Sequence, residues 1–331
     1  MIKTKKIILI FIILLLIIGC KGRKDSGPIT KEEIYKGTDA LVFNFLKNAP
    51  PLQVYASTEN ERSQFSVVIN LENKGAYNIE DGFLTLILEE GYMSIDEWDT
   101  TDQISYAGEN RASFYLEGKS LLNPFGGKDI TTIRVNAQKF PETLSEIHTS
   151  SVLLATCYKY QTNLHENVCI DTDVYDLRNL DKACKVKDLS LTNQGAPVAI
   201  TKVEVEMLPH ENEGKIKPMF TIHVENKGNG EVIRPDEVAI ENACSSKSLK
   251  IKENDLNVVY INTYLSGKEY GLDCVPPSIK LRSKKGFIRC SLKEGKEKQY
   301  GTYESPLIIE LYYGYMQTIA KEVEIKKPVT Y

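Results

Sequence analysis

Residues that carry chemistry are scarce in this 331-residue chain, and the motifs that usually organise them are missing. There are only four histidines, and they lie too far apart for a zinc pattern. No Cys-x-x-Cys, Gly-x-Ser-x-Gly or His-Glu-x-x-His sequence occurs, and no histidine lies near a credible serine or cysteine nucleophile. We therefore expect a protein that is not an enzyme and has no catalytic residue, no metal site and no cofactor.

The chain also has no excess of positive charge. Its 41 Lys and Arg stand against 45 Asp and Glu, which gives a formal net charge of −4 at pH 7. No basic stripe with interleaved aromatics appears, so we expect no nucleic-acid partner. Tryptophan occurs once, against 18 tyrosines, a balance that suits strand faces and contact surfaces.

No long helical stripe is present, and the dominant pattern is the alternation of apolar and polar residues. Phe65, Val67, Ile69 and Leu71 alternate with more polar neighbours, which predicts a strand with one buried face. Asn73-Lys74-Gly75 ends this run with residues that tolerate positive φ angles, so we expect a tight turn there.

Several of these patterns occur twice. Glu-Asn-Lys-Gly ends at Gly75 and again at Gly228, a shift of 153 residues. Tyr-Leu-x-Gly-Lys at 115–119 and 264–268, and Tyr-x-Tyr at 158–160 and 313–315, recur in the same order at shifts of 149 and 155. This repetition indicates two copies of one all-β domain.

The expected strands are short and separated by turn signals. In the first copy they are 40–46, 65–72, 83–89, 112–117, 130–138, 151–160 and 167–171. In the second copy they are 198–207, 219–225, 237–242, 257–265, 278–281, 287–292, 307–313 and 317–325. The last two strands of each copy are expected to form a hairpin, turning near position 163 and at Gly314-Tyr315. The pattern predicts two tandem antiparallel immunoglobulin-like β-sandwiches.

The N-terminus predicts export. Three lysines precede an uninterrupted apolar run at 7–18, as in a secretory signal, and the run is too short to span a bilayer comfortably. Ile17-Ile18-Gly19-Cys20 resembles the lipobox of prokaryotic lipoproteins, which implies cleavage before Cys20 and a lipid on that cysteine. The alternative is an uncleaved hydrophobic anchor with an incidental cysteine. Both place residues 21–331 on the extracytoplasmic face of the membrane, attached to it.

These features divide the chain into five segments. They are a signal or anchor at 1–20, a polar tether at 21–34, a first sandwich at 35–175, a junction at 176–184 and a second sandwich at 185–331.

Six further cysteines are expected to form disulfides, because an even number in an exported chain is typical of a disulfide framework. Cys157 and Cys169 are equidistant from position 163, which predicts a cross-strand pair in the expected hairpin. Cys274 and Cys290 flank another hairpin-like segment and are expected to pair. That leaves Cys184 with Cys244, although four cysteines allow three connectivities.

The repeated Tyr-x-Tyr is the candidate binding surface. Tyr158 and Tyr160 share one face of a strand, as do Tyr313 and Tyr315, because alternate residues point the same way. Two phenol rings on one face suit stacking on a sugar or anchoring a protein partner. The alternative is that these rings pack in the core or across strands.

Two acidic segments raise the question of calcium. They are Asp96, Glu97, Asp99 and Asp102 around Trp98, and Asp171, Asp173 and Asp176 after Cys169. Neither has the spacing of a calcium-binding loop, so solvated acidic loops are the favoured interpretation.

The strand that ends in Asn-x-Gly, at 65–88 and again at 220–242, resembles the cell-adhesion-related domain called CARDB of bacterial and archaeal surface proteins. The resemblance implies a surface binding or spacer module without catalytic residues. We therefore expect a non-enzymatic module in cell-surface adhesion or envelope assembly, with another envelope protein as its partner. The alternative is a carbohydrate- or envelope-polymer-binding lipoprotein that holds a surface glycan.

Overall fold

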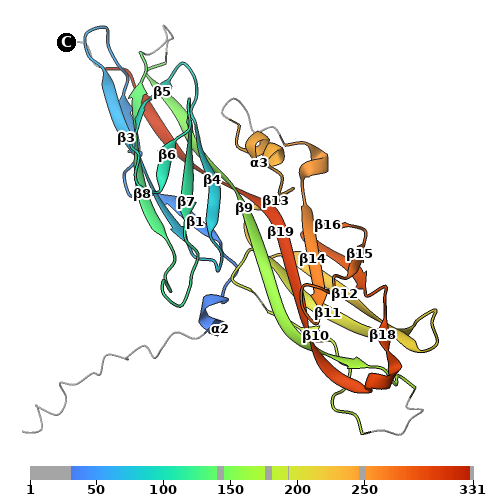
Figure 1. Ribbon diagram of the computed structural model, residues 1–331. Helices are drawn as coiled ribbons and strands as arrows, with labels where there is room; N and C mark the ends of the chain where they lie inside the picture. The colour runs from blue at the N-terminus through green and yellow to red at the C-terminus, as the bar shows by residue number, and fades with distance from the viewer. Residues whose placement is uncertain (1–30, 140–144, 176–180, 193, 246–250, 329–331) are drawn as a thin grey trace, which may run out of the picture.

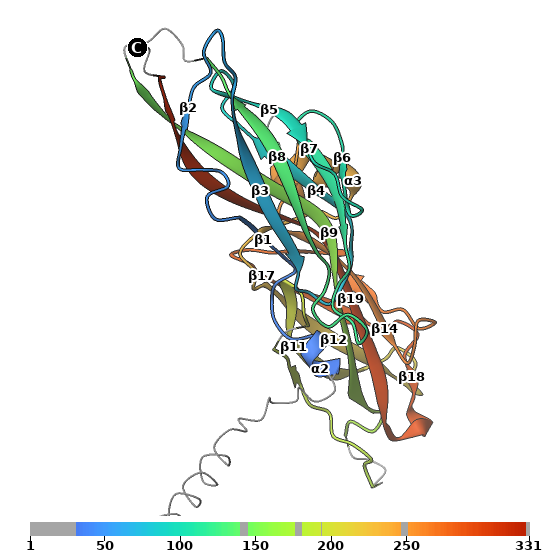
Figure 2. The same cartoon turned by 90° about the vertical axis from the view of Figure 1, so that its left-hand side faces the viewer.

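The computed structural model of the protein describes residues 31–139, 145–175, 181–192, 194–245 and 251–328 (Figure 1). The described chain is mostly β-strand and forms an elongated body in which two β-sandwiches lie end to end (Figure 2). The expected all-β class with antiparallel sheets is confirmed.

Each sandwich has a small sheet of its own. The first sandwich has the order β1 (Leu41–Phe45), β3 (Ser63–Asn73), β8 (Lys128–Ala137) and β5 (Met93–Trp98). The second has β10 (Leu189–Ser190), β11 (Val198–Pro209), β12 (Lys215–Asn226), β17 (Lys285–Ser291) and β15 (Asp273–Val275), with β18 (Lys296–Glu297) beside β12.

One nine-stranded sheet serves both sandwiches as the second layer. Its order is β16 (Ser278–Lys280), β14 (Val258–Leu265), β19 (Thr302–Lys326), β9 (Ile147–Asp171), β4 (Ile79–Ile87), β7 (Arg111–Leu116) and β6 (Ile104–Tyr106). Two short strands, β2 (Gln53–Tyr55) and β13 (Glu231–Ile233), pair with β19 beside this path. The described helical segments are α2 (Lys31–Ile34), α3 (Glu237–Ala243), η1 (Glu253–Asp255) and η2 (Lys298–Tyr300).

The long strands β9 and β19 are the backbone of the molecule. They pair antiparallel along all 25 residues of each, so at about 3.3 Å per residue the ribbon is about 80 Å long. The two expected hairpins are therefore wrong. The segment around position 163 is polar because alternate residues of β9 face solvent, while Thr162 and Leu164 are buried. Gly314 marks no turn, since it lies beneath Ile233 and Ile240, and a Cβ there would approach the Ile233 side chain to 2.6 Å.

Both long strands belong to both sandwiches. The first half of β9 pairs with β4 and the end of β19 pairs with β2, both in the first sandwich. The first half of β19 pairs with β14 in the second sandwich. Each of the two predicted domain segments, 35–175 and 185–331, thus contributes one long strand to both sandwiches.

The predicted alternation in β3 is confirmed, because Phe65, Val67, Ile69 and Leu71 are all buried in the core. The predicted strand at 237–242 is wrong, since this segment is α3. Asp236 caps the helix by accepting a hydrogen bond from the Ala239 backbone N–H at 3.0 Å, and the Ile240 side chain packs beneath it. The end of the predicted tether is also helical: it forms α2, and Ile34 is buried there.

Candidate functional site

The four tyrosines of the repeated Tyr-x-Tyr meet at the centre of the β9–β19 ribbon, which we call the waist. Tyr158 lies opposite Tyr315, and Tyr160 lies opposite Tyr313. Neighbouring rings form a closed cycle with centroid separations of 5.8 to 6.3 Å. The rings are only 0 to 4% exposed. The predicted use of these rings as a binding surface is therefore wrong, and the alternative, packing in the core, is correct.

Each hydroxyl of this tyrosine cluster has a partner. Those of Tyr158 and Tyr313 accept hydrogen bonds from the backbone N–H groups of Leu41 (3.3 Å) and Val198 (3.4 Å). Those of Tyr160 and Tyr315 accept from Tyr77 (3.2 Å) and Gly230 (2.8 Å). Burial raises the pKa of all four phenols, to about 12 for Tyr315. The rings therefore stay neutral and act as packing groups that tie loops to the ribbon.

The repeated Glu-Asn-Lys-Gly turn packs on this cluster. In both copies the asparagine side chain accepts a hydrogen bond at 3.1 Å from the glycine two residues later. A Cβ at Gly75 would overlap the Tyr160 hydroxyl, and one at Gly228 would overlap that of Tyr315. The chain does leave the strand at this point in both copies, but neither glycine has a positive φ. Glycine is required because the tyrosine hydroxyl leaves no room for a side chain.

The register of the ribbon explains how the two repeats are related. Lys159 and Gly314 lie opposite each other and are also equivalent positions in the repeat. The two copies are therefore related by an approximate two-fold axis through this pair. The repeated Glu-Asn-Lys-Gly and the repeated Tyr-x-Tyr are the two sides of one contact, made once in each copy.

The disulfides differ in part from the expected pairs. Cys274 and Cys290 do pair, between β15 and β17. Cys157 pairs with Cys244 instead of Cys169, which links the waist to the end of α3. Cys169 pairs with Cys184. The two wrong assignments share one cause, because β9 continues straight past position 163 and carries Cys157 and Cys169 away from each other.

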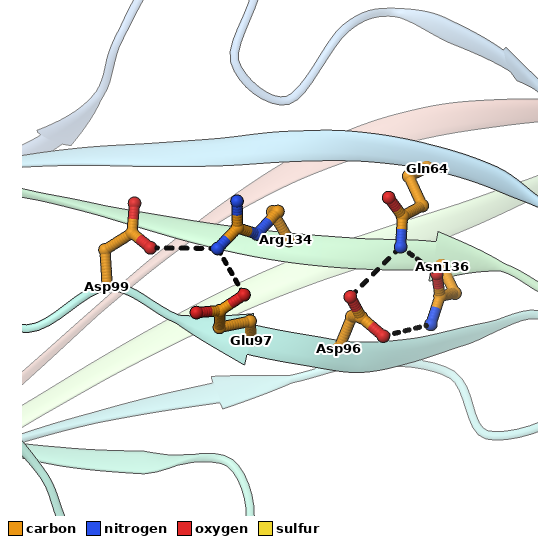
Figure 3. A network of polar contacts seen from close by, with 6 residues as sticks. All are labelled: Gln64, Asp96, Glu97, Asp99, Arg134 and Asn136. Atoms are coloured by element: carbon orange, nitrogen blue, oxygen red, sulfur yellow. Dashed lines mark hydrogen bonds and ion pairs between the residues drawn. The ribbon is translucent and has the colours of Figure 1, made fainter.

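The acidic residues around Trp98 are held by the first sandwich's own side chains (Figure 3). Arg134 of β8 contacts both Glu97 and Asp99, and Asp96 accepts hydrogen bonds from Gln64 (3.0 Å) and Asn136 (3.2 Å). Asp102 lies exposed beyond β5.

The second acidic segment is likewise engaged, because Asp171 pairs with Lys182 at 2.7 Å. Asp176 lies outside the described residues. In the described ranges, no group of three or more His, Cys, Asp or Glu side chains is arranged to hold a metal ion.

A different set of tyrosines lies on the outer side of the nine-stranded sheet, in the second sandwich. Tyr260 and Tyr264 of β14 share a face with Tyr312 of β19, which lies directly opposite Tyr260. We call these three the outer tyrosine face. Tyr260 is 41% exposed. A groove of about 350 Å³ adjoins Tyr312 and is lined also by Glu80, Asp81, Lys159 and Gln161.

A carboxylate lies at the middle of this face. Glu310 pairs with Lys268 at 2.9 Å and accepts a hydrogen bond of 2.9 Å from the Tyr312 hydroxyl. Burial alone would raise the pKa of Glu310, but these two hydrogen bonds and the charge of Lys268 outweigh it and lower the pKa. The face thus presents aromatic rings and neighbouring amides above an ionised carboxylate that is only 6% exposed.

A signal for this face is present in the sequence, outside the repeated motifs. Tyr260-Ile-Asn262-Thr-Tyr264 is itself a period-two pattern that places two tyrosines and an asparagine on one side of a strand. In Tyr312-Tyr313-Gly314-Tyr315, the same alternation sends Tyr312 outward and its two tyrosine neighbours inward.

Cys20 and the apolar run at 7–18 lie outside the described residues. Among the residues that are described, no helix is long and apolar enough to cross a membrane.

Comparisons with known proteins place the chain in no family. No protein-family model matches it, and no curated protein matches it. A solved structure of the serine-rich repeat protein Srr2 from Streptococcus agalactiae aligns over 88% of this chain and 94% of that one, at 11% identity and a TM-score of 0.15. A likeness at that level carries no argument about fold or function, and the resemblance to CARDB stays a prediction.

Proposed function

We propose that the protein is a non-enzymatic, membrane-anchored binding scaffold outside the cytoplasm, acting in cell-surface adhesion or envelope assembly. The observation that carries this proposal is the continuous β9–β19 ribbon. Two sandwiches built on one pair of strands keep a fixed relative orientation, because bending between them requires breaking the pairing at the waist. Surfaces on the two sandwiches are therefore held at a constant separation.

The waist is reinforced on both faces of the ribbon. The tyrosine cluster fills one face, and α3 covers the other, where the Cys157–Cys244 disulfide fixes it. A disulfide of this kind typically contributes about 2–4 kcal/mol. Disulfides also persist in oxidising compartments, which supports the predicted export.

The N-terminal segment joins the body at the waist instead of at one end. The Tyr35 ring, directly after α2, lies 6.4 Å from the Tyr77 ring, and Tyr77 in turn contacts Tyr160 of the cluster. With the predicted lipid on Cys20, the protein is held by its middle and two arms extend from it. This arrangement suits a scaffold that positions two surfaces better than a stalk that lifts one.

Lysine cross-linking on intact cells, followed by mass spectrometry, tests the scaffold. We expect one or two recurrent protein partners, each linked to lysines of one sandwich face. Scattered links to many neighbours would count against it.

Fixed geometry is tested separately with spin labels carried by non-canonical amino acids at Tyr55 and Tyr300, at opposite ends of the body. A narrow distance distribution is expected, and a broad one would remove the structural basis of the proposal.

The outer tyrosine face supports the second candidate, a protein that binds a carbohydrate or another envelope polymer. The exposed Tyr260 ring is available for stacking on a sugar, the half-buried Tyr264 and Tyr312 rings flank it, and the exposed Asn262 amide supplies a hydrogen-bonding group beside them. We expect Tyr260→Ala and Tyr312→Ala to weaken retention on envelope polysaccharide. The matched control is Phe287→Ala, an exposed aromatic on β17 of the other sheet. Equal retention by all three variants would reject this candidate.

A further inference from the structure

The connection between β7 and β8 carries the most concentrated exposed apolar group of the described chain. Leu121, Leu122 and Phe125 are 57%, 98% and 71% exposed, and they lie within five consecutive residues. Isolated exposed apolar residues are ordinary, but several together on one projection mark an interaction site. We call residues 119–126 the apolar loop.

The apolar loop is held in shape by its own hydrogen bonds. Within it, the Asn123 N–H donates to the Ser120 hydroxyl at 2.9 Å and the Ser120 N–H donates to the Asn123 carbonyl at 2.9 Å. At its two ends, the Lys119 N–H donates to Gly75 and the Gly127 N–H to Glu117, both at 2.8 Å. The three apolar side chains are therefore exposed on a loop whose backbone conformation is fixed by hydrogen bonds.

The base of the apolar loop lies beside the entry of the N-terminal segment. Gly118 packs directly against the backbone of Tyr77, and the Tyr77 ring contacts Tyr35, one residue after α2. Figure 1 shows α2 and the connection between β7 and β8 at the same end of the first sandwich. From Cys20 to Lys31 the chain spans at most about 40 Å, so a lipid on Cys20 keeps this part of the body close to the bilayer.

We propose that the apolar loop inserts Leu121, Leu122 and Phe125 into the lipid surface to which the protein is anchored. This proposal rests on the proposed membrane anchoring. The anchor supplies proximity, and the loop adds a second contact that fixes which side of the waist faces the bilayer. Insertion of apolar side chains removes their surface from water, as in other interfacial anchors.

The test uses the oxidised mature chain, residues 20–331, coupled to vesicles. Six of the seven cysteines lie in the three disulfides, so a maleimide lipid reacts at Cys20 and stands in for natural lipidation. The vesicles contain phosphatidylcholine and phosphatidylglycerol, with or without bromine on the acyl chains. Leu122→Trp is the probe, and the buried Trp98 of the parent protein gives the background.

Leu52→Trp is the matched control, because Leu52 is also strongly exposed, at 68%, but lies beside the far end of β19. We expect the emission of Leu122→Trp to shift to the blue and to be quenched by brominated chains, while that of Leu52→Trp does neither. Unchanged emission of Leu122→Trp, or equal quenching of both variants, would overturn the proposal. A concentration-dependent shift of Leu122→Trp without vesicles would also overturn it, and would assign the loop to a second copy of the chain.

A second variant measures the contribution of the loop without coupling. Leu122→Ser is expected to lower the partition of the uncoupled protein onto the same vesicles about tenfold, given the usual contribution of one buried leucine, and Leu52→Ser is expected to leave it unchanged. Equal partition of the two serine variants would contradict the proposal. Whether Cys20 is lipidated in cells is measured separately, by metabolic labelling with an alkynyl fatty acid. Failure of the anchor and failure of the loop are thus distinguishable.

Discussion

The contact between the repeated glycine and the repeated tyrosine makes the sharpest stability prediction. Gly228→Ala places a methyl group against the Tyr315 hydroxyl, and its other near neighbour is the Cβ of Pro197 at 2.8 Å. The Tyr315 ring is held in the core by hydrogen bonds from Gly230 (2.8 Å) and to Asn226 (3.2 Å), so it has little freedom to move away. We expect Gly228→Ala to lower the free energy of unfolding by about 1–3 kcal/mol through overpacking.

A second substitution shows whether the hydroxyl is the cause. Tyr315→Phe removes the overlapping oxygen but leaves the buried N–H of Gly230 without its partner, which costs about 1–3 kcal/mol. In the double variant the methyl group enters part of the space that the hydroxyl occupied. We therefore expect the double variant to be less destabilised than the sum of the single variants, by about 1 kcal/mol.

Urea unfolding of the oxidised protein, followed by circular dichroism, measures these free energies. Gly271→Ala is the matched control, since this glycine has no positive φ and a methyl group added there would meet no heavy atom within 4 Å. Its unfolding free energy should stay within about 0.5 kcal/mol of the parent. A neutral Gly228→Ala, or strict additivity in the double variant, would refute the argument from close packing.

Three further predictions follow from the waist and the outer face. Burial raises the pKa of all four phenols of the tyrosine cluster, to about 12 for Tyr315, so the contribution of Tyr315 to stability is complete below pH 10 and is lost as the pH rises through 12. The phenolate absorbance of these four, among the 18 tyrosines of the chain, should therefore appear only together with unfolding, and ionisation of all 18 before unfolding would contradict this. Replacing Cys157 and Cys244 by serine should cost about 2–4 kcal/mol in urea unfolding, and an unchanged midpoint would show that the link contributes nothing. Because the pKa of Glu310 is lowered in the folded state, the contribution of this carboxylate to stability is present at neutral pH and is lost as the pH falls through that pKa. Glu310→Gln should therefore reduce the loss of unfolding free energy between neutral and acidic pH. The exposed Glu304→Gln is the control and should leave that loss unchanged.

Local patterns predicted much of the secondary structure correctly. Alternation located β3, β8 and β12, because a strand with one buried face needs a period of two wherever it lies in the fold. Repetition likewise indicated two related halves. The helix α3 was missed because Val238 and Ile240 lie two residues apart between Glu237 and Glu241, a spacing that also fits a strand. Its Asp236 cap was a signal for the helix that was available in the sequence.

The candidate site was predicted less well, because the period of a pattern does not say which side of a strand faces the core. Tyr313 and Tyr315 share a face in either case, and only the position of the second sheet decides that this face is buried. For the apolar loop, too, the sequence pattern does not say whether the side chains are buried or exposed. Its residues are apolar in the sequence, but their exposure depends on the hydrogen bonds that hold the loop away from the core.

Strands such as β3, β8 and β12, the duplication, and the pair of motifs that each copy uses to build one contact follow from the order of the amino acids. Only tertiary packing makes β9 and β19 run straight through both halves. The polar stretch around position 163 and the pair Gly314-Tyr315 both have the composition of turns. The first also fits a strand with one face in solvent, and the second also fits a strand that a helix covers. Packing by α3 and the tyrosine cluster selects the straight form, since it buries both faces of the waist. The packing of α3 on the waist also brings Cys157 next to Cys244, two positions that no local sequence pattern connects.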